Sequence, residues 1–201
     1  MNNVTFLNID DLIIDTNNKV KDSRTMIIGN THTGKSLLAM NILQHVKKYI
    51  QHGYVIDDSG KTFYDNVLIN TDTYFSPKVK KYLNTKHDKF FIVDSTKLMF
   101  DYNMEESLNN INRLNIKTLI YLSDRLSNHF TCSSIDNLIL FKFDNYDNIY
   151  KTFVCNNFLI SKDEFDSLVR NYTNDFKCLV IDIKNKQLFY YRTDSRARYL
   201  F

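Results

Sequence analysis

The sequence predicts a three-layer α/β fold, in which a mostly parallel β-sheet carries helices on both faces and has an antiparallel C-terminal edge. Short apolar runs alternate with amphipathic helical patterns along most of the chain. A loop containing glycine and lysine joins an early run to a helix, and a three-residue turn joins the last two runs. With 201 residues, of which 43% are hydrophobic, the chain has enough apolar material for one complete core.

The first residues form a separate region in this prediction. Residues 4–15 contain two short apolar pieces separated by acidic residues, which predict an edge strand or a packing arm. Residues 16–22 are polar and predict a loop. We therefore expect an N-terminal arm over residues 1–22, followed by a single domain over residues 23–201.

The next two elements surround the glycine-containing loop. Residues 25–28 form an apolar run that ends on Gly29, as a buried parallel strand does. From Lys35 onward, apolar residues recur at helical spacing, and we expect this helix to stop near Gly53. The apolar positions of the helix are Leu38, Ile42, Val46 and Ile50.

The middle of the chain continues the alternation of strand and helix. The strand-like runs are 54–56, 67–69, 90–93, 118–122 and 138–141, and helical patterns lie at 77–84 and 103–114. Alternation of this kind predicts a parallel sheet that is covered by helices.

The C-terminal part has a different order. Two helical stretches, 145–155 and 161–172, precede apolar runs at 178–183 and 188–191. Residues 184–186 read Lys-Asn-Lys and predict a hairpin turn, so these last two strands should be antiparallel and lie at the sheet edge.

The loop between the first strand and the helix has the pattern Gly-x4-Gly-Lys-Ser. It consists of Gly29, Asn30, Thr31, His32, Thr33, Gly34, Lys35 and Ser36. Between a strand and a helix, this pattern predicts a phosphate-binding loop whose backbone N–H groups surround the phosphates of a nucleotide. Lys35 would reach the β- and γ-phosphate oxygens, and Ser36 would be a ligand of Mg²⁺. His32 is predicted to be an exposed loop side chain without chemistry of its own.

A second motif follows another buried strand. Residues 90–93 are apolar and Asp94 follows them directly, which predicts a carboxylate that holds Mg²⁺ through water. The catalytic residues predicted from these two motifs are Lys35 and Asp94, and the predicted cofactors are ATP and Mg²⁺. Other acids lie near strand ends, but Asp57 and Asp58 are more simply interpreted as part of a solvated loop, and the position of Asp101 gives no reason to place it at the γ-phosphate.

Composition limits the class of protein. The formal net charge is only +3, so the whole molecule is not an obvious polyanion binder, and the dense basic run at residues 78–81 is most simply a solvated helix face. The three cysteines form no C-x-x-C pair, and no signal peptide or membrane-spanning stretch is evident. We therefore expect an intracellular, soluble protein that has no membrane partner.

The order of these parts resembles the DNA-packaging ATPases of nucleocytoplasmic large DNA viruses, the poxvirus-type branch of the FtsK/HerA superfamily. The segments that carry the resemblance are IIGNTHTGKS, KFFIVDS, RLNIKTLIYLS, IDNLILFKF and the tail IYKTFVCNNFLISKDEFDSLVRNYTNDFKCLVIDIKNKQLFYYR. It covers most of residues 23–193 and implies a P-loop NTPase fold of the additional-strand type. It also implies a homo-oligomeric ring that translocates double-stranded DNA into a capsid, capsid or other packaging subunits as partners, and a location in the host cytoplasm or the virion.

The chain departs from this family at the residues of hydrolysis. Ser95 stands where the family has a second acid, and Ser123 stands where it has a glutamine that senses the γ-phosphate. The segment HFTCSSIDN lacks the arginine expected before the fifth strand, and neither Arg113 nor Arg125 aligns cleanly with that position.

These departures leave the function open between two classes. Loss of an arginine finger alone lowers the rate by roughly 10³–10⁵, so without compensation the chain would bind ATP and hydrolyse it very slowly. The first interpretation is a packaging-type ATPase. The alternative is a catalytically weakened ATP-binding paralogue that acts as a structural or regulatory subunit. A small-molecule kinase is a weaker third option, because no cluster of arginines marks an acceptor site or lid.

Overall fold

A computed structural model describes residues 4–57, 64, 70–72, 74, 76–94, 114–124 and 135–193. Its strands are β1 (Thr5–Phe6), β2 (Ser23–Ile28), β3 (His52–Asp57), β4 (Asn70–Asp72), β5 (Lys89–Asp94), β6 (Ile116–Ser123), β7 (Asn137–Leu140), β8 (Lys177–Asp182) and β9 (Gln187–Arg192). Its helices are α1 (Ile9–Ile13), α2 (Lys35–Val46), α3 (Pro77–Leu83), α6 (Asp147–Ile149), the π-helical turn η4 (Tyr150–Val154) and α7 (Lys162–Tyr172).

The described strands form one sheet in the order β1-β9-β8-β7-β2-β6-β5-β3-β4. Neighbouring strands from β7 to β4 are parallel, whereas β8 pairs in antiparallel fashion with both β7 and β9. This arrangement confirms the predicted mostly parallel sheet and the antiparallel C-terminal hairpin. The two-residue strand β1 lies outside β9 and parallel to it.

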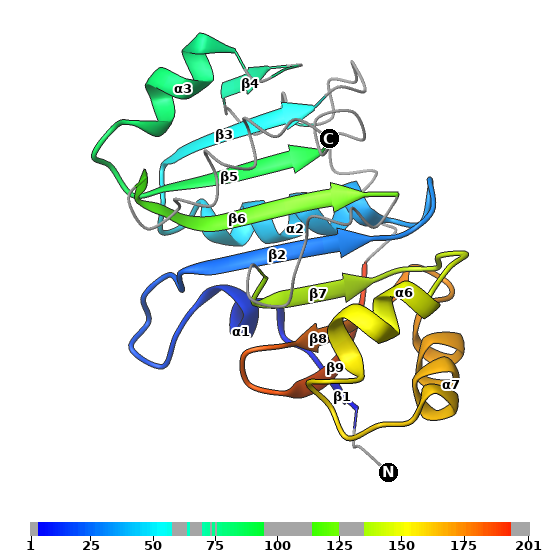
Figure 1. The fold of residues 1–201 in the computed structure, drawn as a ribbon. Coiled ribbons are helices and arrows are strands. Elements are labelled where there is room, and N and C mark those ends of the chain that lie inside the picture. The colour runs from blue at the N-terminus through cyan, green and yellow to red at the C-terminus, as the bar shows by residue number, and fades with distance from the viewer. Residues whose placement is uncertain are drawn as a thin grey trace.

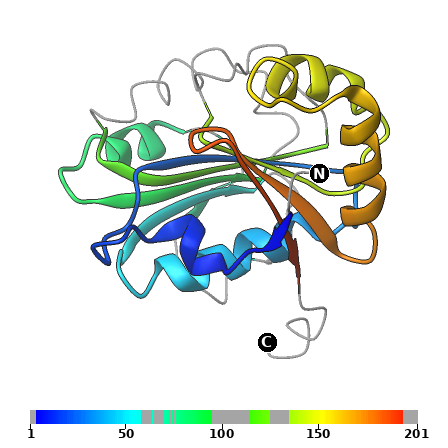
Figure 2. The same cartoon turned by 90° about the horizontal axis from the view of Figure 1, so that it is seen from below.

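The sheet is the middle of three layers. Helices α1 and α2 cover one face, and α3 together with the α6–η4–α7 unit covers the other (Figures 1 and 2). Successive residues of β2 point to opposite faces, so Met26 and Ile28 belong to one buried cluster and Ile27 to the other. The first cluster contains Phe153 and Phe165 from the C-terminal helices, and the second contains Leu38 and Leu43 from α2. The predicted three-layer α/β fold is therefore confirmed.

Helix α2 is shorter than the sequence pattern predicted. It ends at Val46, and a turn over residues 47–49 leads into β3, where Gly53 is the second residue. The expectation that the helix stops near Gly53 was wrong, because this glycine has a packing role in the sheet. A Cβ atom at Gly53 would lie only 1.7 Å from the ring of Phe90 on the neighbouring strand β5.

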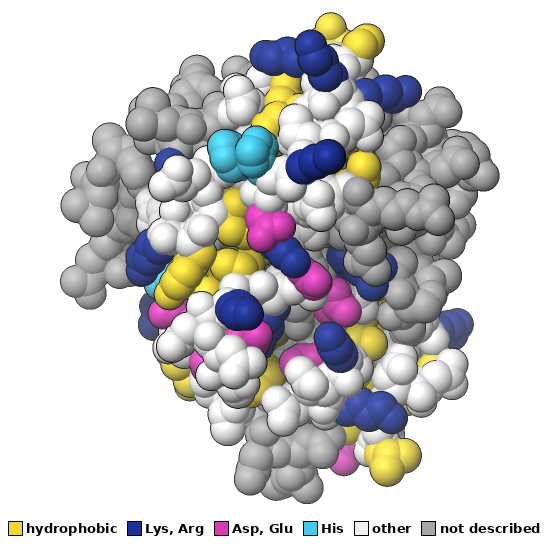
Figure 3. All heavy atoms as spheres, turned by 90° about the vertical axis from the view of Figure 1, so that its left-hand side faces the viewer, with side chains coloured by type: hydrophobic (Ala, Val, Ile, Leu, Met, Phe, Trp, Pro, Cys, Tyr) yellow, Lys and Arg dark blue, Asp and Glu magenta, His cyan; other side chains and the backbone are white. Residues whose placement is uncertain are grey.

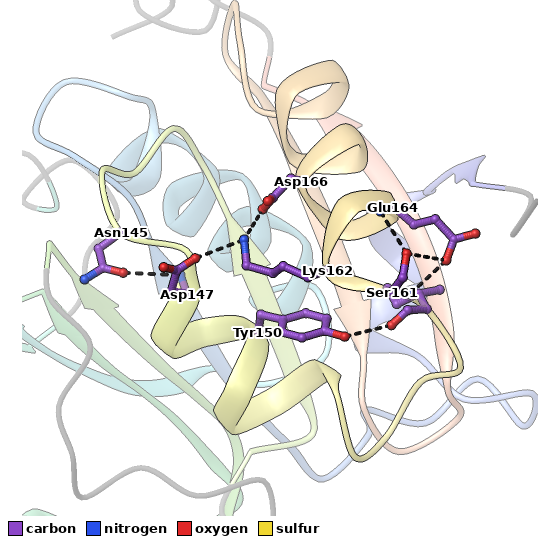
Figure 4. Close-up of polar contacts among 8 residues, drawn as sticks. Asn145, Asp147, Tyr150, Ser161, Lys162, Glu164 and Asp166 are labelled. Carbon is purple, nitrogen blue, oxygen red and sulfur yellow. Dashed lines mark hydrogen bonds and ion pairs between the residues drawn. The ribbon is translucent and has the colours of Figure 1, made fainter.

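The two C-terminal helices are held together by polar contacts (Figure 4). The Lys162 ammonium at the start of α7 forms ion pairs with Asp147 of α6 and with Asp166 one turn further along α7. Ser161 caps α7: its side chain accepts the N–H of Glu164, while the Glu164 carboxylate accepts the N–H of Ser161 at 2.8 Å. The helical stretches predicted at 145–155 and 161–172 are both present, although the first contains a π-helical turn.

The N-terminal residues join the same layers as the rest of the chain. Strand β1 extends the sheet at its edge, and α1 contributes Ile9, Leu12 and Ile13 to the core cluster that contains α2. Both roles named for this segment, edge strand and packing arm, are therefore seen. The division into an arm of residues 1–22 and a domain of residues 23–201 stays a prediction. The predicted strand at 67–69 and nearly all of the predicted helix at 103–114 lie outside the described residues.

None of the described helices has the length and apolar character needed to cross a membrane.

Candidate nucleotide-binding site

The candidate site lies where the parallel strands end. Strand β2 sits between β6 and β7, and the chain leaves β2 through the glycine-containing loop into α2. The chain then proceeds to β3 on one side of β2 and later returns to β7 on the other side, so β2 lies at a reversal of strand order. In open α/β sheets, ligands bind at the carboxyl ends of the strands beside such a reversal. The phosphate loop predicted from the sequence occupies this position.

Two glycines give the loop its shape. A Cβ atom at Gly29 would lie 2.6 Å from the Cβ of Phe141, so only glycine permits this close approach to the end of β7. Gly34 has a φ of +109°, which side chains disfavour, and it forms the N-cap of α2. Gly29 and Gly34 are therefore both positions of the loop at which the backbone geometry favours glycine.

The loop is also tied to the segment that follows β7. The Asn30 backbone N–H donates to the carbonyl oxygen of Lys142 at 2.8 Å, and its side-chain amide donates to Asp144 Oδ1 at 2.9 Å. Within the loop, the Thr33 hydroxyl donates to the carbonyl of Asn30 at 2.8 Å. These contacts fix the first half of the loop. His32 is exposed, as expected, with a φ of +62°.

Lys35 is the first residue of α2, and its side chain folds back onto the loop. Its Nζ donates to the carbonyl oxygens of Gly29 and Asn30 at 2.7 and 2.8 Å. Burial lowers the pKa of the ammonium, and the nearby carboxylates of Asp94 and Asp124 partly offset this effect. An ammonium in this position can bind phosphate oxygens as a point charge.

Ser36, Asp94 and Tyr64 meet beside the lysine. Asp94 Oδ2 accepts hydrogen bonds from the hydroxyls of Ser36 and Tyr64, both at 2.8 Å. Burial raises the pKa of the Asp94 carboxyl, and the two hydroxyl donors counteract this rise. The structure thus places Ser36, which was predicted to be a ligand of Mg²⁺, against Asp94, which was predicted to hold the ion through water. Serine and aspartate supply oxygen donors, the chemistry that Mg²⁺ prefers, so Ser36 and Asp94 fit this ion.

Asp57 lies next to this cluster rather than in a solvated loop. It is the last residue of β3, it is 7% exposed, and it pairs in register with Asp94 of β5. Its negative charge contributes to the raised pKa of Asp94. The solvated-loop interpretation of Asp57 was wrong, because the strand continues one residue further than the apolar pattern indicated.

The end of β6 adds Asp124, which was not among the residues predicted from the sequence. Ser123 is 4% exposed, pairs with Ile28 of β2, and its carbonyl oxygen accepts the Gly29 N–H at 3.2 Å. Asp124 follows directly, and its Oδ1 is buried without a hydrogen-bond donor among the described residues. The sequence did carry a signal, because an acid directly after a buried strand is the same pattern that singled out Asp94.

Tyr64 was also missed. It is 1% exposed, and burial together with the Asp94 charge raises the pKa of its hydroxyl. No sequence pattern marks it, because it belongs to neither a strand nor a motif.

Several residues considered from the sequence lie outside the described part of the chain. These are Asp58, Ser95, Asp101, Arg113 and Arg125. The basic run at 78–81 lies on α3, where the three lysines are exposed and Val79 faces the core, as expected for a solvated helix face.

Comparison with solved structures gives the fold class of this chain. It is similar to the DNA-packaging ATPase B204 of Sulfolobus turreted icosahedral virus, with a TM-score of 0.60, 18% identity, and coverage of 85% of this chain and 97% of that one. The genome-packaging NTPase B204 of Sulfolobus turreted icosahedral virus 2, in complex with AMP, matches with a TM-score of 0.58 and 16% identity over 83% and 95% of the two chains. The conjugation coupling protein TcpA of pCW3 matches with a TM-score of 0.62 and 13% identity over 89% of this chain and 62% of that one.

No family model and no curated protein matches the sequence. The structural likenesses, at these low identities, show that the chain has the α/β fold of P-loop NTPases. The glycine-lysine loop stands in that fold at the carboxyl end of β2, where the nucleotide site was predicted.

Proposed function

We propose that this chain is an ATP-binding P-loop ATPase that translocates double-stranded DNA, of the kind that packages viral genomes. The observation that carries the proposal is the convergence of Lys35, Ser36 and Asp94 at the carboxyl ends of the parallel strands, with Ser36 and Asp94 in contact at 2.8 Å. The similar solved structures support it, since they are a packaging ATPase, in complex with AMP in one case, and a conjugation coupling protein.

Each residue of the site has a defined part in binding. The backbone N–H groups from Asn30 to Lys35 surround the β-phosphate at the N-terminus of α2, where the helix dipole favours negative charge. Lys35 leaves the carbonyls of the loop and binds the β- and γ-phosphate oxygens. Ser36, and Asp94 through water, would hold Mg²⁺, and the ion would supply positive charge to the same oxygens.

The assembly and its partners follow from the resemblance found in the sequence. We propose a homo-oligomeric ring that acts on double-stranded DNA, with capsid or other packaging subunits as partners, at the viral assembly site in the host cytoplasm or in the virion. Assignment to the poxvirus-type branch is part of the same proposal and rests on the sequence segments alone.

A second candidate function is a catalytically weakened ATP-binding subunit. Ser123 favours it, because a short hydroxyl stands at the end of β6 where the family has a glutamine, and it is buried. This candidate shares the ATP site with the first one, but it hydrolyses ATP more slowly and acts as a structural or regulatory subunit.

Thermal unfolding with ATP and Mg²⁺ tests the binding site that both candidates share. A ligand at 100 times its Kd stabilises the folded state by about 2.7 kcal/mol. We expect this stabilisation in the wild-type protein and its loss in Lys35→Ala, which removes the charge that meets the phosphates. Lys78→Ala on α3 is the matched control, because it removes an exposed lysine from another part of the molecule. An equal shift in Lys35→Ala and wild type would contradict the proposed site.

A further inference from the structure

Ser95 stands where the family that the chain resembles has the acid that orients the attacking water, and the end of β6 offers a carboxylate of its own. Asp124 follows Ser123 at the carboxyl end of this strand. Strand β6 lies between β2, which leads into the phosphate loop, and β5, which ends on Asp94. Asp124 is therefore on the side of the loop where Lys35 and Asp94 gather.

The surroundings of Asp124 set it apart from an ordinary strand-terminal residue. Its Oδ1 is buried, and no described residue donates a hydrogen bond to it. A buried carboxylate oxygen without a donor is costly, and such groups in folded proteins call for an explanation such as a catalytic role or an ordered water. Among the described residues, Asp94 and Asp124 are the acids whose charges raise the pKa of the Lys35 ammonium. Of these two, Asp94 is already engaged by Ser36 and Tyr64.

We infer that Asp124 is a catalytic residue of the proposed ATPase, which accepts a hydrogen bond and then the proton from the water that attacks the γ-phosphate. This inference rests on the proposed function, because it requires ATP in the loop. It gives a donor to Oδ1, which accepts a hydrogen bond from no described residue, and it lets Asp94 serve the metal while Asp124 serves the water. The second acid thus comes from the neighbouring strand and not from the position after Asp94.

The chemical step is a hydrolysis. The water oxygen forms a bond to the γ-phosphorus while the bond from that phosphorus to the β–γ bridging oxygen breaks. The bridging oxygen leaves on ADP with the electron pair of that bond. The water proton passes to the Asp124 carboxylate and then to solvent, and the products are ADP and inorganic phosphate.

Asp124→Asn tests the inference, because the amide keeps the size of the side chain and cannot take up the proton. The measurements are single-turnover phosphate release from ATP and Mg²⁺, with and without duplex DNA, and equilibrium binding of a non-hydrolysable ATP analogue. General-base catalysis contributes roughly 10²–10⁴-fold, so we expect phosphate release to slow by that order. Analogue affinity should stay equal or rise, because a negative charge near the phosphates is removed.

Two further variants make the result specific. Asp124→Glu keeps a carboxylate and should recover part of the lost rate. Asp163→Asn removes an exposed acid from the first turn of α7 and should leave the rate unchanged.

The outcomes separate this inference from the proposed function. An unchanged rate in Asp124→Asn overturns the inference, and so does a parallel loss of rate and analogue affinity, which would mean that Asp124 only balances the charge of Lys35. A wild-type chain that binds the analogue but releases no phosphate also overturns it. A wild-type chain that binds no nucleotide contradicts the proposed function itself.

Discussion

At the scale of single residues, the ionised Asp94 carboxylate lowers the stability of the folded protein. The Asp94 carboxylate is largely buried beside Asp57, and burial raises its pKa. A carboxyl whose pKa is higher in the folded than in the unfolded state lowers stability when it is ionised. This cost is present above the folded-state pKa and disappears as the pH falls below the unfolded value of 3.8. Binding of a divalent cation would relieve the same cost.

Asp94→Asn should therefore affect the stability of the free protein and the binding of Mg²⁺ in different ways. The amide oxygen can still accept hydrogen bonds from Ser36 and Tyr64, and the buried charge is gone. We expect the melting temperature of the free protein to be equal or higher near neutral pH, whereas the additional stabilisation that Mg²⁺ gives to ATP binding should be lost. Thermal unfolding with ATP, in the presence and absence of Mg²⁺, measures both effects.

An Asp94→Asn variant that melts well below the wild type would show that the charge stabilises the free fold. One that retains the full Mg²⁺ effect would remove Asp94 from the metal site. Asp163→Asn on α7 is a suitable control, because it removes an exposed acid from outside the candidate site.

At the scale of elements, the sequence predicted most strands, because each is a short apolar run in a sheet that is buried on both faces. It failed where tertiary contacts decide the structure. Gly53 resembled a helix end but is a strand residue whose missing side chain makes room for the Phe90 ring. Asp57 resembled a loop residue because a polar side chain ended the apolar run, yet it pairs with Asp94 inside the sheet. Neither pairing partner is evident from local spacing.

The position of the glycine-containing loop was predictable for the opposite reason. The pattern that predicts it is local: two glycines, a lysine and a serine stand at fixed spacing between a strand and a helix. Two contacts of the site were not predictable, because Asp144 and Tyr64 come from distant parts of the chain and no local pattern marks them as partners of Asn30 and Asp94.

Helix α7 offers a test of local structure. Ser161→Ala removes the hydroxyl that accepts the Glu164 N–H, and loss of an N-cap costs about 1 kcal/mol. For a chain of this length, that corresponds to a fall in melting temperature of about 2–4 °C, measurable by circular dichroism. Ser167→Ala, at an exposed position inside the same helix, should not lower it. Equal melting of both variants would mean that the capping box does not limit stability.

At the scale of the whole molecule, the candidate site lies at the carboxyl ends of the parallel strands. Figure 3 shows the opposite end of the molecule, where lysines and arginines are dispersed among acidic side chains and form no continuous basic surface among the described residues. Contact with DNA needs several positive charges that act together on phosphates. The proposed contact with DNA therefore depends on other surfaces or on the assembly of several chains.

The central claim is that this chain binds ATP in the loop Gly29–Ser36 and hydrolyses it in response to DNA. Single-turnover release of inorganic phosphate from bound ATP and Mg²⁺, followed with and without duplex DNA, tests it most directly. We predict that DNA accelerates release in the wild-type protein at ~50 mM salt, that the acceleration falls steeply by ~200 mM salt as counterion release requires, and that Lys35→Ala abolishes release. A wild-type rate that DNA does not change, and that equals the Lys35→Ala rate, would contradict the account.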